Sequence, residues 1–251
     1  MKKIAAFTIV RDESYFLPLW IAYYKSVADY ILVLDNNTED GSTKNLDVDV
    51  REVKGEYAYD QKFINKVVRK TQRELLKEYD YVIYAEADEI LIPLNQDLRD
   101  YIIEKDENAI MAQGYDVVQL EGEKEAPYDS NILFERTMME FQWDICKTLI
   151  AKIPLNWDLG FHNPGVDYYE DPDFYMIHLH KINKYYAFHR RLERTKWKWD
   201  PEDLEERRTW HYWLLDEEKF NEWYTPTNLH LIPEQIKKRF KEHVQKNMED
   251  Y

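Results

Sequence analysis

Charged and amide side chains directly follow three apolar runs of this sequence. The three clusters are Arg11-Asp12-Glu13, Asp35-Asn36-Asn37 and Glu86-Ala87-Asp88-Glu89. Because the carboxyl ends of parallel strands meet at one edge of a sheet, and ligands bind in the crevice there, we expect the clusters to lie close together. Each one alone also fits a helix cap or a turn. Their combination predicts a binding site at that edge.

Glu86 and Asp88 carry the most specific chemistry. In an extended segment, residues two apart point to the same side, so their carboxylates would lie next to each other. Paired hard oxygen donors suit Mg²⁺ or Mn²⁺. Such a cation neutralises the charge that develops on a departing diphosphate. The alternative is a helix N-cap, but the apolar residues 90–92 and Pro93 favour a short extended continuation.

Two kinds of segment alternate over residues 4–85. Strands are predicted at 4–10, 30–34, 48–53 and 81–85, and helices at 15–26 and 60–77. This alternation predicts right-handed crossovers and a mostly parallel sheet. The predicted strands are apolar throughout, as expected when helices cover both faces of a sheet.

The rest of the chain is less regular. Strands are predicted at 109–120, 147–153 and 174–180, and helices from 201 onward, including 217–224 and 233–247. The last helix carries an apolar stripe among cations, which fits docking on the domain better than contact with an anionic membrane. We therefore expect an α/β chain with one domain over residues 1–200 and a helical extension over 201–251 packed on it.

Composition excludes several classes of protein. A formal charge of −15 argues against general nucleic-acid binding. The 6 glycines do not cluster, so the chain has no P-loop and no dinucleotide-binding turn, and side chains, isolated amides or a metal must hold any phosphate. No apolar run is long enough to span a bilayer. The single cysteine, Cys146, suits a reducing compartment, and we expect a cytoplasmic protein.

Several blocks of the sequence, in chain order, resemble family 2-like glycosyltransferases with the GT-A fold. The blocks are residues 7–13, the helix around Trp20, residues 34–42, 157–162 and 177–181, together with Glu86-Ala87-Asp88-Glu89-Ile90-Leu91, which is similar to the family's Asp-X-Asp metal motif. The resemblance covers about residues 4–190. It implies a GT-A-like fold with a mostly parallel sheet flanked by helices. The implied activity is transfer of a sugar from a UDP- or GDP-linked donor to a hydroxyl of a glycan or another acceptor, by inversion in the family's manner.

The same resemblance assigns roles around an Mn²⁺ or Mg²⁺ ion. Asp88 is the main expected ligand. Glu86 replaces the first aspartate of the motif, and its extra methylene favours contact with the ribose, or with the metal through water. His162 and His180 are alternative ligands from the late part of the chain, although each also fits a hydrogen-bonded structural histidine.

Donor-binding residues follow in the same way. Asp35 is expected near the nucleoside, with Thr8 and Arg11 on the floor of that pocket, while Gln61 faces either the donor or solvent. Residues 181–198 contain 7 cations against one acid, and some of them are expected to hold the diphosphate. The candidates are Lys181, Arg190 and Arg191. The alternative is a solvated helix face paired with the acids of 202–206.

A general base is needed if the displacement is a single inverting step. A carboxylate beside an aromatic ring that can stack on a sugar face is the natural choice. Asp144 beside Trp143 and Asp158 beside Trp157 both qualify, and we prefer Asp144.

Two other classes of function remain open at this point. A nucleotide-sugar or carbohydrate-binding module without turnover is consistent with Glu86 and with 15% aromatic residues. A metal-dependent hydrolase or nucleotidyltransferase would call for a denser cluster of histidines and aspartates.

Overall fold

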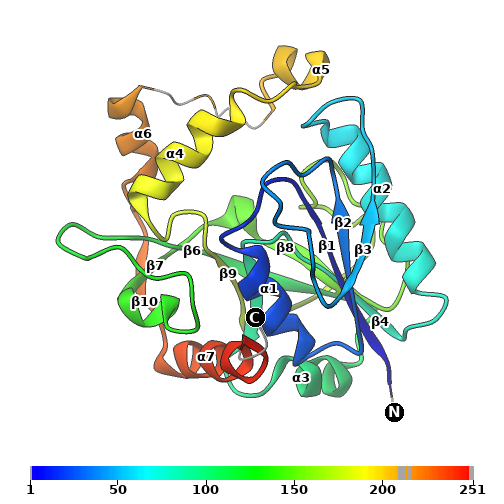
Figure 1. The fold of residues 1–251 in the computed structure, drawn as a ribbon. Coiled ribbons are helices and arrows are strands. Elements are labelled where there is room, and N and C mark those ends of the chain that lie inside the picture. Colours follow the sequence, from blue (N-terminus) through cyan, green and yellow to red (C-terminus); the bar gives the residue numbers. More distant parts are fainter. Residues whose placement is uncertain (1, 209–212, 214–215, 249–251) are drawn as a thin grey trace.

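The computed structural model describes residues 2–208, 213 and 216–248 (Figure 1). Within this part, a ten-stranded mixed sheet forms the centre, and helices flank it. Its N-terminal half is parallel, in the order β3-β2-β1-β4. These strands are β1 (Ile4–Val10), β2 (Tyr30–Asp35), β3 (Asp49–Glu52) and β4 (Tyr81–Tyr84). All four match predicted strands, and the weakest of them, β3, is the exposed one.

Helices α1 (Leu17–Lys25) and α2 (Gln61–Leu75) make the two crossovers of this parallel half. The step from β1 to β2 and the step from β3 to β4 run in opposite directions along the sheet. Right-handed crossovers therefore place the two helices on opposite faces. Asp60 caps α2 by accepting a hydrogen bond from the amide of Phe63 at 2.8 Å.

The other half of the sheet is mainly antiparallel. Strand β8 pairs with β4, β6 with β8, β7 with β6 and β10 with β7, while β9 lies parallel to β6 and pairs with β5. The strands are β5 (Glu89–Pro93), β6 (Ala109–Val117), β7 (Met138–Phe141), β8 (Lys147–Ala151), β9 (Tyr169–His178) and β10 (Leu229–Leu231). Strands β7 and β10 lie outside the predicted strands. The extended continuation predicted beyond Asp88 is β5.

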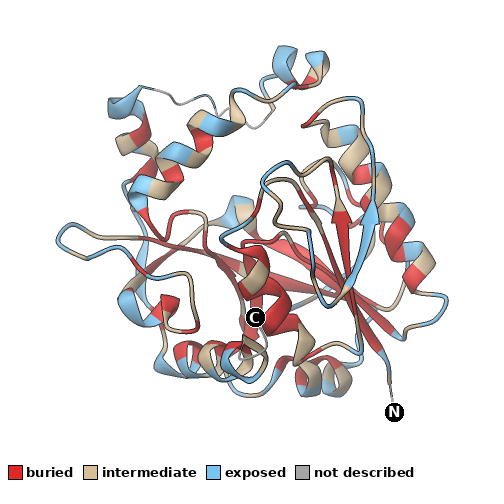
Figure 2. Ribbon diagram, viewed as in Figure 1, coloured by how far each residue is buried: buried red, intermediate tan, exposed pale blue. Residues whose placement is uncertain are grey.

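Burial is densest at α1 and the central strands (Figure 2). Helix α1 is buried on all sides because it lies between the sheet and α7 (Glu234–Met248), which packs along it. Ile236, Phe240 and Val244 of α7 are fully buried, so the stripe predicted to dock on the domain does so. The remaining helices are α3 (Leu98–Lys105), α4 (Lys184–Arg194), α5 (Pro201–Glu205), α6 (Glu217–Tyr224) and the short 3₁₀ turns η1 (Ile132–Glu135) and η2 (Trp143–Ile145).

This arrangement confirms the expected α/β fold, with a helix-flanked central sheet and a mainly helical C-terminal portion. The C-terminal portion also adds β10 to the sheet. The division at residue 200 stays a prediction. Among the described residues, no helix combines the length and the apolar character that crossing a membrane requires.

Candidate active site

The three polar clusters meet at one cavity of about 480 Å³ at the carboxyl ends of the parallel strands. Arg11 and Glu13 reach it from the end of β1, Asn36 from the end of β2, and Glu86 and Asp88 from beyond β4. The opposite wall comes from later parts of the chain. Its polar and aromatic members include Asp144, Lys147, His162, His178, His180, Arg190, Arg194 and Trp197.

Local turns aim the first two clusters at the cavity. Asp12 and Asn37 have φ values of 55° and 59°, the left-handed region that aspartate and asparagine enter more readily than most residues. The carboxylate of Asp12 accepts hydrogen bonds from the amides of Glu39 at 2.6 Å and Asp40 at 3.0 Å. The loop after β1 is thereby tied to the loop after β2.

Asp88 lies at the bottom of the cavity and is 5% exposed. Its Oδ2 accepts a hydrogen bond from Nη1 of Arg190 at 2.7 Å. Burial alone would raise the pKa of Asp88, but the Arg190 guanidinium, with His178 and His180, outweighs it and holds the pKa well below its usual range. Asp88 is therefore an anion at neutral pH.

A carboxylate, two imidazoles and a lysine come together beside Asp88. Nδ1 of His178 lies 2.9 Å from Oδ1 of Asp116, and Nε2 of the same ring lies 3.8 Å from Oδ2 of Asp88. His180 Nε2 lies 3.3 Å from Asp116 Oδ1, and Lys181 Nζ lies 3.0 Å from Asp116 Oδ2. Asp116 is thus held on one side by histidine and on the other by lysine.

The charges in this group explain its pKa shifts. Burial would lower the pKa of His178, but its hydrogen bond to Asp116 and the Asp88 carboxylate outweigh burial and raise it. Burial and the neighbouring His178 lower the pKa of His180 to about 3, so this ring is neutral at pH 7. Its Nε2 is buried and meets no hydrogen-bond partner among the described residues.

These donors fit a divalent cation. Ligand atoms of Asp116, His178 and His180 lie within 4.8 Å of one another, and Asp88 faces His178 from the other side. Carboxylate and imidazole together suit ions such as Mn²⁺. A cation at Asp88 and His178 would replace the imidazole proton, as is general for histidine ligands. Asp116 would hold the far side of the His178 ring, a common arrangement around ligating histidines.

The third acid of this segment, Glu89, plays a structural part. Glu89 is completely buried, accepts a hydrogen bond from the amide of Glu86 at 2.9 Å, and pairs with Lys147 at 2.6 Å. Glu86 and Glu89 outweigh the effect of burial and raise the pKa of Lys147, so its ammonium stays charged. Glu86 itself lies half-exposed in the cavity, 3.6 Å from Lys147.

Asp144 reaches the cavity from η2, which lies against β6 at a glycine. A Cβ added to Gly114 would come within 2.5 Å of the Ile145 side chain and 2.7 Å of its backbone, so only glycine permits this close approach. Trp143 precedes Asp144 and is 72% exposed, with its ring edge-to-face against Phe141. Asp144, which lines the cavity, thus directly follows an exposed aromatic ring.

Eight of the residues predicted from sequence line this cavity. They are Arg11, Gln61, Glu86, Asp88, Asp144, His162, His180 and Arg190. Of the two histidines, His180 belongs to the group around Asp116, whereas His162 is an exposed residue of the cavity wall.

Five other predicted residues lie outside the lining of the cavity. Thr8 is buried within β1. The Asp35 carboxylate accepts hydrogen bonds from the Thr38 amide at 2.8 Å and the Thr43 hydroxyl at 2.6 Å, and thus holds the turn after β2. The Asp158 carboxylate accepts one from the Asn163 amide at 3.0 Å within its own loop.

The remaining two are cations directed away from the cavity. Lys181 is buried against Asp116, with its Nζ 4.3 Å from the centroid of the Trp223 ring. The Arg191 guanidinium lies 3.4 Å from the centroid of the same ring. The first contact joins α6 to the segment after β9, and the second joins α6 to α4.

Three residues of the site were not chosen as site residues from the sequence, although His178 lies in the block 177–181 and Arg194 in the cation-rich segment 181–198. Asp116 and His178 lie 62 positions apart and become neighbours through the parallel register of β6 and β9. Arg194 lies one helical turn after Arg190 and pairs with Glu13 at 2.8 Å. The repeat of arginines four residues apart was the available signal for Arg194, whereas Asp116 carries no local signal at all.

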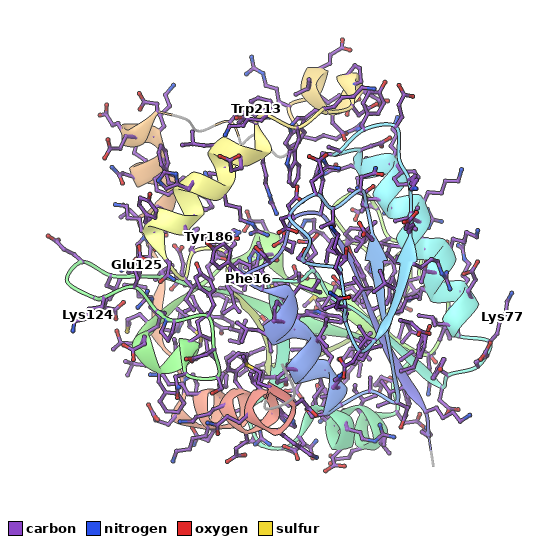
Figure 3. The ribbon with its side chains drawn as sticks, in the orientation of Figure 1. Phe16, Lys77, Lys124, Glu125, Tyr186 and Trp213 are labelled. Carbon is purple, nitrogen blue, oxygen red and sulfur yellow. The ribbon has the colours of Figure 1, made fainter. Side chains whose placement is uncertain are left out.

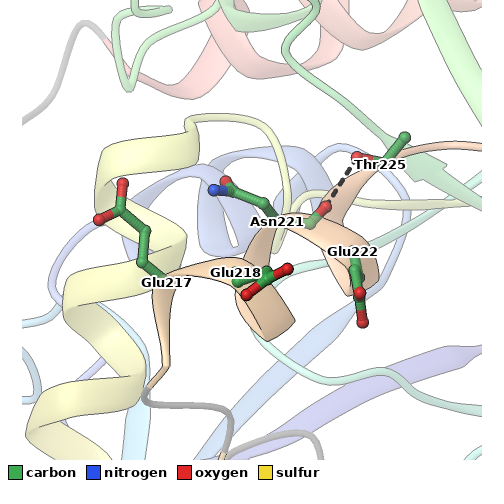
Figure 4. Close-up of a pocket in the computed structure, with 5 residues that line it drawn as sticks. All are labelled: Glu217, Glu218, Asn221, Glu222 and Thr225. Carbon is green, nitrogen blue, oxygen red and sulfur yellow. Dashed lines mark hydrogen bonds between the residues drawn. The ribbon is translucent and has the colours of Figure 1, made fainter.

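A second hollow, of about 620 Å³, runs along α6 (Figure 4). Its lining is formed by Glu217, Glu218, Asn221, Glu222 and Thr225. The three glutamates are all exposed to solvent, and the residues that line this hollow include no basic side chain. The cavity at the strand ends is therefore the better candidate for chemistry.

No protein-family model matches this sequence, and no curated protein matches it. Among solved structures, glucosyl-3-phosphoglycerate synthase from Mycobacterium tuberculosis, in complex with Mn²⁺, UDP-glucose and phosphoglyceric acid, is 12% identical with a TM-score of 0.33. The match covers 46% of this chain and 44% of that one, so this chain spans less than half of that protein.

The same enzyme in complex with Mn²⁺, UDP and glucosyl-3-phosphoglycerate is 11% identical, with a TM-score of 0.32 over 46% of this chain and 44% of that one. A proposed glucose-1-phosphate thymidylyltransferase from Bacillus anthracis, in complex with a sucrose, is 9% identical, with a TM-score of 0.32 over 98% of this chain and 95% of that one. With TM-scores below 0.5, these likenesses do not bear on the activity of this chain.

Proposed function

We propose that this protein is a glycosyltransferase that moves a sugar from a nucleotide-sugar donor to an acceptor hydroxyl, with inversion at the transferred carbon. The observation that carries the proposal is the composition of one cavity. It combines an anionic Asp88 beside imidazoles, two arginines on α4, and a carboxylate beside an exposed tryptophan at the mouth.

Donor binding divides between the two walls. Arg190 and Arg194 would hold the diphosphate through guanidinium–phosphate hydrogen bonds. Asn36 would contact the nucleoside, since its buried Oδ1 meets no hydrogen-bond partner in the part of the chain that the structure describes. UDP- and GDP-linked sugars are the donors to test first. Asp35 and Thr8 would act indirectly, by shaping the turn and strand beneath this pocket.

Asp88 and His178, with His180 beside them, would hold Mn²⁺ or Mg²⁺. The ion supplies charge neutralisation for the leaving diphosphate. Asp144 would accept the proton of the acceptor hydroxyl as that oxygen attacks the sugar, and Trp143 would stack on the acceptor ring. Glu86 would meet the ribose or the ion through water. The reducing environment expected for Cys146 favours a cytoplasmic location.

A screen of nucleotide sugars by thermal shift with Mn²⁺, followed by chromatography of released nucleoside diphosphate, tests the proposal. A donor at a hundred times its Kd should add about 2.7 kcal/mol, or roughly 5 to 10 °C for a domain of this size. Asp88→Asn should abolish release while keeping the fold. Full release by that variant, or by the wild type in excess chelator, would remove the metal from the proposal.

One observation favours a second candidate, a nucleotide-sugar-binding module without turnover. The Arg190–Asp88 ion pair already neutralises the carboxylate that a cation would need. Binding of a nucleotide sugar with no release of nucleoside diphosphate, under any metal and any acceptor in the panel, would establish this candidate.

A further inference from the structure

Four charged side chains form a connected group of ion pairs in the cavity. Arg190 donates from Nη1 to Asp88 at 2.7 Å and from Nη2 to Glu13, and Arg194 donates to the same Glu13 oxygen at 2.8 Å. The exposed fractions of the four side chains lie between 7% and 12%. Two acids face two guanidiniums, so the group is neutral as a whole. Any added charge must therefore be balanced by another.

Helix α4, which carries both arginines, is fixed at its start. Asn183 precedes the helix and is buried, and it exchanges hydrogen bonds with Ala126 through both its side-chain nitrogen and oxygen. One turn later the Tyr186 ring lies against Phe16, with centroids 5.5 Å apart, and the two labelled side chains lie close together in Figure 3. The Arg190 guanidinium lies above the same Phe16 ring.

The segment after α4 is fixed as well. The ring centroids of Trp199 and Tyr59 lie 4.4 Å apart, and backbone hydrogen bonds join this segment to Ala58 and Tyr59 on the other side of the cavity. Since both ends of α4 are held, the long arginine side chains are the parts that can move. The position of the helix stays constant.

A divalent cation that approaches Asp88 alone meets a cation already in place. To bind Asp88 it must displace the Arg190 guanidinium, which would then lie nearly buried without its Asp88 partner and close to two new positive charges. Removal of one partner from a buried ion pair is strongly unfavourable. A nucleoside diphosphate in the same cavity changes this balance, because its oxygens offer Arg190 and Arg194 charge-assisted, bidentate partners.

We propose that Arg190 is an exchange residue, which occupies Asp88 until a diphosphate draws its guanidinium away. A divalent cation and a nucleoside diphosphate then bind cooperatively, and each binds weakly alone. This inference rests on the proposed function, since it assumes that the cavity takes a diphosphate. Coupling between two ligands is reciprocal, and typical values correspond to a change of about 5- to 150-fold in each affinity.

The test measures binding and needs no turnover. Mn²⁺ affinity is measured by electron paramagnetic resonance with and without UDP. UDP affinity is measured by calorimetry, once with Mn²⁺ and once with chelator. If UDP does not bind, GDP replaces it in both measurements. The variant is Arg190→Gln, and the matched control is Arg194→Gln, which removes a guanidinium that contacts Glu13 and leaves the Arg190–Asp88 pair in place. Circular dichroism and melting verify that both variants fold.

Arg190→Gln should change the two affinities in opposite directions. Without nucleotide it should bind Mn²⁺ about tenfold more tightly than the wild type, since a charge-assisted hydrogen bond no longer competes. Without metal it should bind UDP about tenfold more weakly, and the coupling between the ligands should fall to less than about threefold. Arg194→Gln should weaken UDP binding as well, but its gain in Mn²⁺ affinity without nucleotide should be much smaller than that of Arg190→Gln, and the coupling should remain.

Unchanged or weaker Mn²⁺ binding by Arg190→Gln would overturn the exchange role, whatever happens to UDP. Equal Mn²⁺ affinity of the wild type with and without bound nucleotide would overturn it too. Failure of the wild type to bind either UDP or GDP is a different result. It would refute the proposed donor, and the exchange role with it. A gain of Mn²⁺ affinity in Arg190→Gln would in that case still show that the Arg190 guanidinium competes with Mn²⁺ for Asp88.

Discussion

Glu89→Gln should destabilise the protein severely, although Glu89 belongs to the segment Glu86-Ala87-Asp88-Glu89 that resembles a metal-binding motif. The Glu89 carboxylate accepts hydrogen bonds from two donors, the Lys147 ammonium at 2.6 Å and the Glu86 amide at 2.9 Å. A glutamine has a single side-chain oxygen, so one of these donors would face an NH₂ group. Lys147 would keep only Glu86 as an acidic partner, at 3.6 Å and half-exposed to solvent.

The size of the effect follows from the distance and the burial. At 2.6 Å, two unit charges attract by about 6 kcal/mol when the effective dielectric constant is about 20. Part of this loss is offset because the neutral glutamine no longer bears the cost of burying a carboxylate. Removal of one partner from a buried pair therefore costs about 3 to 5 kcal/mol in net terms. For a domain of this size, that corresponds to a fall in Tm of roughly 6 to 20 °C.

Urea unfolding followed by circular dichroism measures the loss directly. The double variant Glu89→Leu/Lys147→Met should recover most of it, because neither partner is then left charged and buried. Glu52→Gln is the matched surface control, since its pair with Lys54 is largely exposed and should contribute almost nothing. A loss below about 1 kcal/mol for Glu89→Gln, or no recovery in the double variant, would refute the buried-charge reasoning.

Three further predictions concern the site and the response to pH. Asp116→Asn should weaken Mn²⁺ binding about 10- to 100-fold by electron paramagnetic resonance, because its carboxylate orients His178. Asp144→Asn should lower turnover by roughly a hundredfold at saturating donor while donor affinity stays constant, and the reverse result with Asp158→Asn would exchange the two roles. Burial lowers the pKa of His243, so below about pH 6.5 the unfolded chain binds a proton that the folded chain does not. Stability should therefore fall as pH decreases, by up to about 1.4 kcal/mol per pH unit, and His243→Gln should remove this part of the slope in unfolding measured between pH 7 and 5.

The local sequence was sufficient for the parallel half of the sheet. Strands β1, β2 and β4 are continuous apolar runs that end in polar clusters, and such a run has few options other than a strand covered on both faces. The stripe of Ile236, Phe240 and Val244 was likewise sufficient for the docking of α7, because residues three and four apart share one helix face. Strands β7 and β10 escaped prediction because neither contains the continuous apolar run that marked the equally short β4.

The roles of the cations after β9 show what sequence alone left open. The segment 181–198 offers 7 cations, and nothing in their order tells which face of a helix will meet the cavity. Packing of Tyr186 and Ala187 fixes the rotation of α4, so that Arg190 and Arg194 point inward while Arg191 stacks on Trp223. Helical phase relative to the rest of the protein is a tertiary property.

The residues around Asp88 show the same division. The sequence by itself determined that carboxylates would gather at the ends of the parallel strands, because strand direction alone brings those ends to one edge. Only the tertiary structure decided which partners they meet. Asp116 faces His178 through the register of β6 and β9, and Arg190 reaches Asp88 across 102 positions of the chain. Such contacts depend on strand register and on the rotation of docked helices, and both are set by packing of the whole core rather than by any local pattern.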